Sequence, residues 1–245
     1  MSDAISLSVI VPAFNEEKLI ASSLRSIRAA LTAQPPAGFR WELIVCDNNS
    51  TDRTAELAQA AGARVVFEPV NQIARARNAG AGAAQGDWLL FIDADSWPSP
   101  ALIADLCAAI RAGDCVGGGS IVAMRNLPFS AELLLRLWNA ISTQAHWAAG
   151  SFVFCRRDGF EAIGGFSLEL FAAEEIDFSK RLTAWGRDRD LRFRILQAHP
   201  LLTSERKTTL YSRGEHLKLL WRGMLSRSGG VRDKETCHIW YDGRR

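Results

Sequence analysis

The chain has 245 residues, of which 48% are hydrophobic and 23% charged, and its formal net charge is +2. This composition is typical of a globular protein with one large domain or two small ones. No apolar stretch approaches the roughly 18 to 20 residues that a membrane span needs, so no spanning helix is predicted.

Predicted strands and helices alternate along the first part of the chain. Strands are expected at residues 5–11, 41–46, 64–67 and 88–92. Helices are expected from about residue 15, over 54–61 and over 74–84. This alternation predicts a parallel sheet with helices around it, in one α/β domain. The C-terminal third is expected to pack on this sheet or to be appended to it.

The fourth predicted strand ends abruptly in two carboxylates, Asp93 and Asp95. Ligands of open α/β sheets bind beyond the carboxyl ends of the strands. Two carboxylates at that place repel each other unless a cation lies between them, and hard divalent ions such as Mg²⁺ or Mn²⁺ often share such ligands with substrate phosphates. The segment therefore indicates a metal–diphosphate site, although Asp is also common in ordinary turns.

Polar clusters follow three of the predicted strands, at residues 12–17, 47–52 and 93–96. Parallel strands bring these clusters to one edge of the sheet, where they could contact the base and ribose of a nucleotide and hold a cation for its phosphates. Asp52 could instead cap the following helix, whereas Asp47 lies directly at a strand end and is the better ligand candidate.

Arg75, Arg77 and Asn78 lie on the Ala-rich helix predicted at 74–84. The small neighbouring residues permit close approach of a ligand or of another element of the fold. Arg77 and Asn78 are therefore candidates for ligand contact, and a solvated helix face is the alternative.

A second acidic cluster, Glu174, Glu175 and Asp177, precedes a predicted helix that continues through Arg181. Crowded carboxylates raise one another's pKa, which lets one of them act as a general base near neutral pH. Part of the cluster could instead favour the positive N-terminal end of that helix. The glycines at 164–165 predict a turn upstream of it.

The C-terminal region is the more basic part of the chain. Residues 1–150 carry 11 basic against 14 acidic side chains, and residues 151–245 carry 18 against 13. Anionic groups are thus expected on the C-terminal side, where residues 203–207 are a candidate diphosphate clamp and His199 or His216 a candidate extra metal ligand. No nucleic-acid-binding motif is present, so no nucleic-acid partner is expected.

Two apolar patterns with helical spacing allow two interpretations each. They comprise Leu133, Leu134, Leu137, Trp138 and Ile141, and Leu217, Leu220, Trp221, Met224 and Leu225. Each pattern predicts either a helix packed on the core or a membrane-surface face for a lipid-linked acceptor.

The five cysteines have no CxxC spacing and are odd in number, which argues against a disulfide framework or a zinc site. They favour a reducing compartment. Because the first residues also lack a basic region before their apolar run, a cytoplasmic location is expected. Peripheral contact with the inner face of a membrane stays open.

Five segments together resemble a known family. They are SVIVPAFNEE at 8–17, CDNNSTDRT at 46–54, ARNAG at 76–80, FIDADS at 91–96, and GGF at 164–166 with FAAEEIDFSKRLTAWG at 171–186. In order and spacing they resemble the inverting family 2 glycosyltransferases of the GT-A fold, over about residues 5–190. The resemblance implies a Rossmann-like, mostly parallel sheet flanked by helices, with a helical C-terminal portion. It also implies one domain, with a nucleotide-sugar-binding half at about 1–115 and an acceptor-binding half at about 116–245.

The resemblance implies roles for individual residues on the donor side. The nucleotide pocket would be lined by Pro12, Ala13, Glu16 and Asp47, with Asp47 facing the base, while Arg77 and Asn78 would help to hold the nucleotide. Asp93, Ala94 and Asp95 would form the DxD-like segment that contacts the donor. Within it, Asp93 and Asp95 would bind Mn²⁺ or Mg²⁺, with Asp95 as the more direct ligand.

On the acceptor side, Glu175 stands where the family usually carries the Asp of its "ED" motif, the acceptor base. The longer side chain is a departure from the pattern, and it leaves Glu174 as a competitor for the role and Asp177 as a further candidate. The expected reaction moves a sugar from a nucleotide-diphosphate donor to a hydroxyl of a saccharide, a lipid-linked acceptor or a small molecule, in cell-envelope polysaccharide, glycolipid or glycoconjugate synthesis.

Two other functions compete with sugar transfer. A nucleotidyltransferase would carry a Gly-rich, basic loop after the first strand, where this chain has PAFNEE. A non-catalytic nucleotide-sugar-binding protein would carry a broken metal or base motif, and both motifs are present. The sequence indicates neither the donor sugar nor the oligomeric state.

Overall fold

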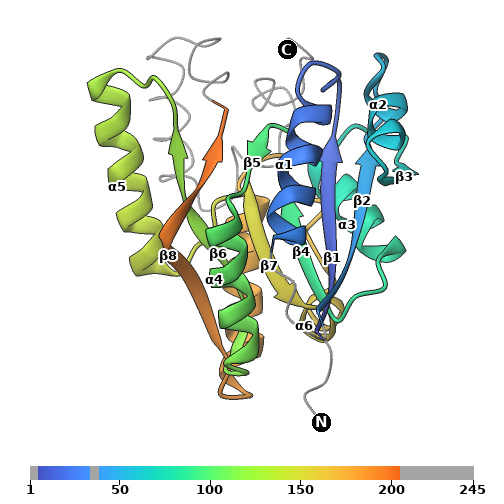
Figure 1. Ribbon diagram of the computed structural model, residues 1–245. Coiled ribbons are helices and arrows are strands. Elements are labelled where there is room, and N and C mark those ends of the chain that lie inside the picture. Colours follow the sequence, from blue (N-terminus) through green and yellow to red (C-terminus); the bar gives the residue numbers. More distant parts are fainter. Residues whose placement is uncertain (1–4, 34–38, 205–245) are drawn as a thin grey trace.

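The computed structural model describes residues 5–33 and 39–204. These residues form an eight-stranded sheet in the order β3-β2-β1-β4-β7-β6-β8-β5 (Figure 1). The strands are β1 (Ile5–Ala13), β2 (Phe39–Asp47), β3 (Arg64–Phe67), β4 (Trp88–Ile92), β5 (Ser96–Trp97), β6 (Cys115–Met124), β7 (Phe152–Arg156) and β8 (Arg192–Thr203). The helices are α1 (Ile20–Thr32), α2 (Thr54–Ala60), α3 (Ile73–Ala83), α4 (Pro100–Arg111), α5 (Phe129–Ala145), α6 (Arg157–Ala162) and α7 (Glu174–Arg187).

The first half of the sheet is parallel, as the alternation of strands and helices predicts. β1 pairs in parallel with β2 and with β4, and β2 pairs in parallel with β3. The first helix is the exception to the predicted bounds, because it begins at Ile20 and not near residue 15. Asn15 adopts a left-handed conformation with φ 53°, and the Glu16 carbonyl accepts hydrogen bonds from the amides of Leu19 and Ile20. A turn therefore separates β1 from α1.

The second half of the chain extends the same sheet. β7 is antiparallel to both β4 and β6, while β6 is parallel to β8 and β8 antiparallel to β5. Up to residue 204, the second half of the chain therefore belongs to the same sheet as the α/β unit, since β7 pairs with β4 and β8 pairs with β6. The predictions for His216, Cys237, the pattern at 217–225 and the helical C-terminal portion concern residues outside those that the structure describes.

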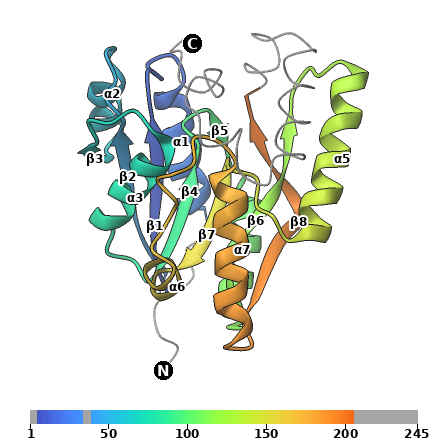
Figure 2. The ribbon, with the colours of Figure 1, turned by 180° about the vertical axis from the view of Figure 1, so that it is seen from behind.

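Apolar clusters fill both faces of the sheet. On one face of the sheet lie α1 and α4 (Figure 1), and on the other lie α3, α6 and α7 (Figure 2). The small residues of α3 let it lie close to β1: a Cβ at Gly80 would lie 2.5 Å from Ile10 Cγ2. These small residues therefore serve helix–strand packing, one of the two uses that the sequence permits.

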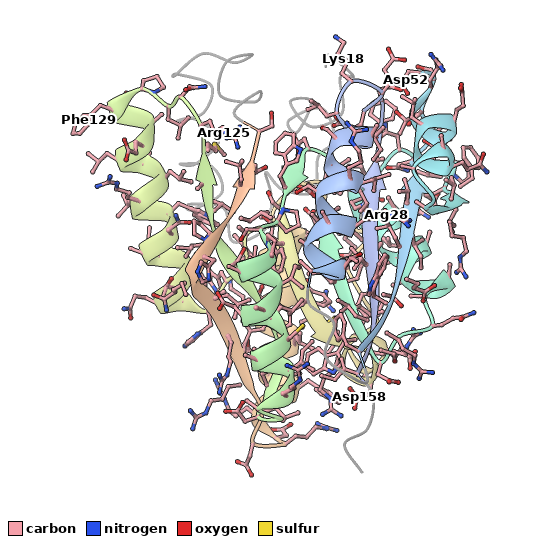
Figure 3. All side chains as sticks on the ribbon, viewed as in Figure 1. Lys18, Arg28, Asp52, Arg125, Phe129 and Asp158 are labelled. Carbon is pink, nitrogen blue, oxygen red and sulfur yellow. The ribbon has the colours of Figure 1, made fainter. Side chains whose placement is uncertain are left out.

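The outer face of α5 is apolar and exposed. Phe129 is 82% exposed, Leu133 59% and Leu137 55%, and Phe129 projects outward at one end of the helix (Figure 3). Leu134 and Ile141 are exposed as well. The prediction of packing on the core is therefore wrong for these exposed side chains. It is right for Trp138, which packs against the core together with Leu135. Among residues 5–33 and 39–204, no helix is long and apolar enough to cross a membrane.

The cysteines that the structure describes are free and buried. They are Cys46, Cys107, Cys115 and Cys155. Burial raises the pKa of the Cys46 thiol to about 12 and that of Cys115 to about 11. The described part of the chain thus fits the expectation of free thiols.

Consecutive glycines allow β6 to lie between β7 and β8. A Cβ at Gly118 would overlap the Arg194 carbonyl oxygen of β8 and would lie 2.8 Å from Phe154 Cζ of β7. At Gly82, on the exposed side of α3, a Cβ would meet nothing within 4 Å. The two glycines therefore differ in the space around them.

Gly118→Ala should destabilise the fold by about 2 kcal/mol or more, because the Arg194 backbone of β8 and the Phe154 ring of β7 would both have to move. Gly82→Ala should stabilise it by about 0.5–1 kcal/mol, the helix-propensity difference between the two residues. Urea unfolding of both variants measures the two free energies. A loss at Gly118 no larger than the change at Gly82 would contradict the packing described for β6.

Candidate active site

The carboxyl ends of β1, β2 and β4 meet at one edge of the sheet. Parallel pairing places Ala13 beside Asp47 and Ile10 beside Phe91. The three polar clusters that follow these strands therefore start from neighbouring positions, which confirms the prediction of a common edge.

The loops after β1 and β2 are bonded to each other. The Asn15 amide donates to Ser50 Oγ (3.0 Å), and the Thr51 amide donates to Asn15 Oδ1 (2.8 Å). Asn15 and Asn49 both have positive φ, at 53° and 66°, a conformation that Asn tolerates better than most residues. This edge of the site is thus fixed before any ligand binds.

Asp52 links the same loops and bonds the first residue of α2. Its Oδ1 accepts from the Thr54 amide (2.9 Å) and its Oδ2 from the Glu17 amide (3.1 Å). Burial alone would raise the pKa of Asp52, but the hydrogen bonds from Thr54 and Glu17 outweigh it, and the pKa is lowered. The N-cap position itself is Arg53, so Asp52 supports the start of α2 from one residue before the cap.

The residues expected to line the nucleotide pocket lie around the ends of β1 and β2. Pro12 and Ala13 pair with Cys46 and Asp47, and the Asp47 carboxylate accepts from the Ser50 amide (3.2 Å). Glu16 is buried, and its amide donates to Thr54 Oγ1 (2.7 Å). Strand pairing thus holds Pro12 and Ala13, whereas hydrogen bonds with Thr54 and Ser50 hold Glu16 and Asp47.

The DxD-like segment forms a tight turn after β4. The Asp93 carbonyl accepts from the Ser96 amide (3.1 Å), and the Asp95 carbonyl accepts from the Ser204 amide (3.1 Å). Ala94 belongs to the apolar core. Asp95 is buried, and the Asp93 side chain is 18% exposed.

Asp93 and Asp95 are the residues of this edge that could hold a metal ion. In the part of the chain that the structure describes, no three or more His, Cys, Asp or Glu side chains gather in a metal-binding group. His199 on β8 is paired with Asp105 of α4 (2.9 Å). Of the predicted diphosphate clamp at 203–207, Thr203 is buried, and its Oγ1 accepts a hydrogen bond from Ser96 Oγ (3.0 Å). Residues 205–207 of that clamp lie outside the described ranges.

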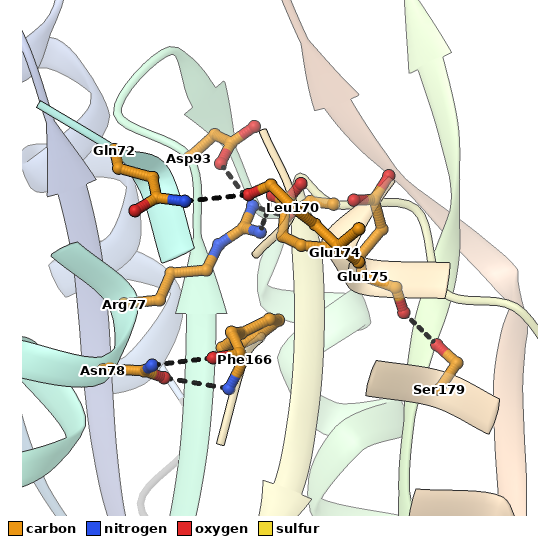
Figure 4. A network of polar contacts seen from close by, with 10 residues as sticks. Gln72, Arg77, Asn78, Asp93, Phe166, Leu170, Glu174, Glu175 and Ser179 are labelled. Carbon is orange, nitrogen blue, oxygen red and sulfur yellow. Dashed lines mark hydrogen bonds and ion pairs between the residues drawn. The ribbon is translucent and has the colours of Figure 1, made fainter. Parts of the chain in front are cut away.

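Arg77 joins the end of β4 to the start of α7 (Figure 4). Its side chain is 1% exposed; Nη1 donates to Glu174 Oε1 (2.7 Å), and Nη2 donates to Asp93 Oδ1 (3.3 Å) and to the Gly150 carbonyl (2.8 Å). Burial would lower the pKa of the guanidinium, but the carboxylates of Glu174 and Asp93 outweigh it and raise the pKa. Arg77 is therefore a permanent buried cation.

Glu175 lies next to this ion pair. Burial raises the pKa of its carboxyl to about 8, the Glu174 carboxylate adds to the rise, and Arg77 opposes only part of it. A Cβ at Gly150 would lie 3.2 Å from Arg77 Nη2 and 3.4 Å from Glu175 Cδ, so the absence of a side chain there keeps space beside the carboxyl. A carboxyl with a pKa near neutral can exchange a proton at physiological pH.

The other two carboxylates in the first turn of α7 are each paired with an arginine. Glu174 is buried against Arg77, and Asp177 is paired with Arg181 (2.7 Å). Arg181 in turn donates to the carbonyls of Ile163 (2.7 Å) and Gly165 (2.9 Å). Asp177 thus supports the turn at the two glycines, both of which have positive φ.

The structure also brings in residues that the sequence analysis did not identify. Gln72, just before α3, donates from Nε2 to the carbonyls of Leu168 and Leu170, and Gly150 accepts from Arg77. A polar residue before a helix gives no sign of a partner about 100 residues away. Sequence alone therefore offered no basis for assigning Gln72.

The model of the family described as "Glycosyl transferase family 2" matches residues 8–164. The glycosyltransferase AglE of Haloferax volcanii is 27% identical over 207 residues, which cover 79% of this chain and 66% of that protein. An uncharacterized glycosyltransferase of Mycobacterium tuberculosis is 40% identical over 104 residues, covering 41% of this chain and 43% of the relative. The chain thus spans about 43% to 66% of the length of these relatives.

Solved structures share the fold. The mannosyltransferase PcManGT from Pyrobaculum calidifontis, in complex with GDP-Man and Mn²⁺, has a TM-score of 0.64 at 21% identity, covering 97% of this chain and 69% of that one. The glucosyl-3-phosphoglycerate synthase of M. tuberculosis, in complex with Mn²⁺, UDP and glucosyl-3-phosphoglycerate, has a TM-score of 0.61 at 23% identity, covering 92% and 82%. The described sheet and its helices thus have the GT-A fold, and with the family model matching well over half of its length, the chain belongs to glycosyl transferase family 2.

Proposed function

We propose that the protein transfers a sugar from a nucleoside-diphosphate donor to an acceptor hydroxyl, with inversion at the anomeric carbon. The observation that carries this proposal is the contact between the two acidic segments. Arg77 bonds Asp93 at the end of β4 and Glu174 at the start of α7, which brings the candidate donor site beside a carboxyl with a pKa of about 8. Relatives of this fold have been crystallised with UDP, UDP-GlcNAc or GDP-Man.

The donor would bind along the carboxyl ends of β1, β2 and β4. Pro12, Ala13, Glu16 and Asp47 would line the pocket for the nucleoside, with Asp47 facing the base. This assignment follows the family resemblance and is supported by the shared edge of the strands. The half of the chain up to about residue 115 would thus serve the donor, and the remainder the acceptor.

Asp93 and Asp95 would hold a divalent metal ion, Mn²⁺ or Mg²⁺. Carboxylate oxygens suit such hard cations, which commonly bind one or two carboxylates and complete their ligands with water and substrate phosphates. A site with two carboxylates at the donor edge fits that pattern. When bound, the ion supplies Lewis-acid stabilisation of the diphosphate as it leaves.

Glu175 would act as the general base. Glu174 and Asp177 are paired with arginines, which leaves Glu175 as the carboxyl of this turn for proton transfer. It would remove the acceptor proton while the acceptor oxygen bonds to the anomeric carbon and the bond from that carbon to the donor phosphate breaks. The transition state would resemble an oxocarbenium ion.

Glu175→Gln should lower the transfer rate by about 10²- to 10⁴-fold, since the amide cannot take the proton. Donor binding should survive, because Glu175 lies on the acceptor side. Sugar transfer and donor-induced thermal shifts on the same preparation measure the two effects. Loss of donor binding with Gln would assign Glu175 to the donor site instead.

The same variant has a pH-dependent effect on stability. The folded carboxyl has a pKa of about 8, above the ordinary value of 4.5 that it has in the unfolded chain, so the wild-type fold loses stability as pH rises between these values. Relative to the wild type, Glu175→Gln should therefore become more stable from pH 5 to about pH 8. Unfolding by urea at several pH values tests this, and a pH-independent difference between the two proteins would contradict the raised pKa.

Asp95→Ala should abolish metal-dependent donor binding. In the wild type, a saturating donor at about 100 times its Kd adds about 2.7 kcal/mol of stability. Thermal shifts with UDP-, GDP- and dTDP-sugars, with and without Mn²⁺, identify the nucleotide class. His199→Ala is the control, because that side chain is paired with Asp105. A donor shift that persists in Asp95→Ala would remove Asp95 from the metal site.

The apolar face of α5 favours an acceptor presented at a lipid surface. The exposed apolar side chains belong to α5, which lies in the acceptor half of the chain. Arg125 precedes this helix (Figure 3), and Arg136 lies on it. Amphipathic helices with basic neighbours bind anionic lipid surfaces. We therefore include peripheral contact with a membrane, on its cytoplasmic face, in the proposed function, in the synthesis of a glycolipid or envelope glycan.

The double variant Leu133→Glu, Leu137→Glu should lose binding to phosphatidylglycerol vesicles without a loss of folding stability, because both side chains are more than half exposed. Vesicle co-sedimentation measures the binding. Phe67→Glu is the matched control, since Phe67 is 60% exposed and lies on β3, an edge strand far from α5, which packs on β6. Equal retention of all three proteins on vesicles would exclude α5 as the contact.

A further inference from the structure

Three polar side chains at the start and middle of α3 reach across to the segment that leads into α7. Gln72, Arg77 and Asn78 all bond residues between 166 and 174 (Figure 4). The sequence analysis expected Arg77 and Asn78 to hold the nucleotide. In the fold, Asn78 bonds Phe166 on the acceptor side of the site, and Arg77 bonds both Asp93 and Glu174.

Asn78 uses both ends of its amide on one residue. Its Nδ2 donates to the Phe166 carbonyl (2.8 Å), and its Oδ1 accepts from the Phe166 amide (2.9 Å). A Cβ at Gly165 would lie 2.7 Å from Asn78 Oδ1, and Gly165 has φ +69°, so glycine at 165 permits this approach. The Phe166 ring stacks on Phe178 of α7 at 4.3 Å between centroids.

Gln72 holds the next part of the segment. It is 2% exposed, and its Nε2 donates to the carbonyls of Leu168 and Leu170, both at 2.9 Å. Its own backbone amide donates to Asn48 Oδ1 (2.9 Å), at the end of β2. The side-chain amino group of Gln72 therefore donates both of its hydrogen bonds to residues 168 and 170, and the backbone of Gln72 is bonded to the donor edge through Asn48.

The segment ends in a strained residue between two of these contacts. Ala173 has φ 60°, a left-handed conformation that is unfavourable for a residue with a Cβ. Leu170 before it is held by Gln72, and Glu174 after it by Arg77. Such a conformation persists where its surroundings fix it from both sides.

We infer that Gln72 and Asn78 are positioning residues, which hold residues 166–174 so that the first turn of α7 presents Glu175 to the acceptor. The inference rests on the proposed role of Glu175 as base. Neither amide contacts the donor in this assignment. A base misplaced by about 1 Å can cost about 10²-fold in rate, so the contacts that fix this segment bear directly on the reaction.

The test uses Gln72→Ala and Asn78→Ala with two matched controls. Asn139 makes the same pair of amide bonds to a backbone, with Val122 N (3.1 Å) and Val122 O (2.9 Å) on β6, so Asn139→Ala removes equivalent hydrogen bonds elsewhere. Gln85→Ala changes an exposed glutamine just beyond α3. If Asn78→Ala does not fold, Asn78→Asp keeps the shape and the acceptor atom and loses the Nδ2 donor.

Hydrogen exchange and kinetics give independent readouts. In Gln72→Ala and Asn78→Ala, amides 166–174 should exchange about tenfold faster, and in the controls at the wild-type rate. Transfer should fall about 10²-fold with a higher acceptor KM, while the Kd for the donor nucleotide stays within about twofold. Unchanged exchange together with weaker nucleotide binding would overturn the inference and return Asn78 to the nucleotide site. Hydrogen exchange tests the contacts of Gln72 and Asn78 even if the wild type transfers no sugar. A failure of the positioning role can therefore be told apart from a failure of the proposed sugar transfer.

Discussion

The candidate site depends on a single buried cation. Arg77 lies beside three carboxyls: that of Asp93 after β4, and those of Glu174 and Glu175 in the first turn of α7. One positive charge cannot neutralise three carboxylates, so the site retains an excess of negative charge when all are ionised. Burial is the main reason for the raised pKa of Glu175, and this excess of negative charge adds to it. The same excess would favour a cation at Asp93 and Asp95 in the proposed function. Removing a buried partner of such a network costs about 3–5 kcal/mol.

Local patterns predicted the parallel half of the fold well. The apolar runs at 5–11 and 88–92 are buried strands, and the helices at 54–60 and 73–83 lie within a residue of their expected bounds. The common edge of three polar loops followed from this alternation. The placement of β7 between β4 and β6 did not, because a strand's partner depends on contacts between residues far apart in the chain.

For the site, residue types were easier to predict than partners. Asp93 stood out because ligands of open α/β sheets bind beyond the carboxyl ends of the strands. Glu175 stood out because it stands where the family that the chain resembles carries its acceptor base. Arg77 and Asn78 were recognised as unusual, yet their bonds to Glu174 and Phe166 follow from the meeting of α3 and the 166–174 segment in space. Gln72 carries no pattern at all. The exposed face of α5 was open to two interpretations, since periodicity does not tell which neighbour covers an apolar stripe.

β4 has a further consequence for how the protein moves. It pairs with β1 on one side and with β7 on the other, so the parts that would bind donor and acceptor share one strand. A hinge between two rigid lobes would have to break the hydrogen bonds of a central strand. Within residues 5–33 and 39–204, closure around substrates would therefore be confined to the loops at the carboxyl ends of the strands.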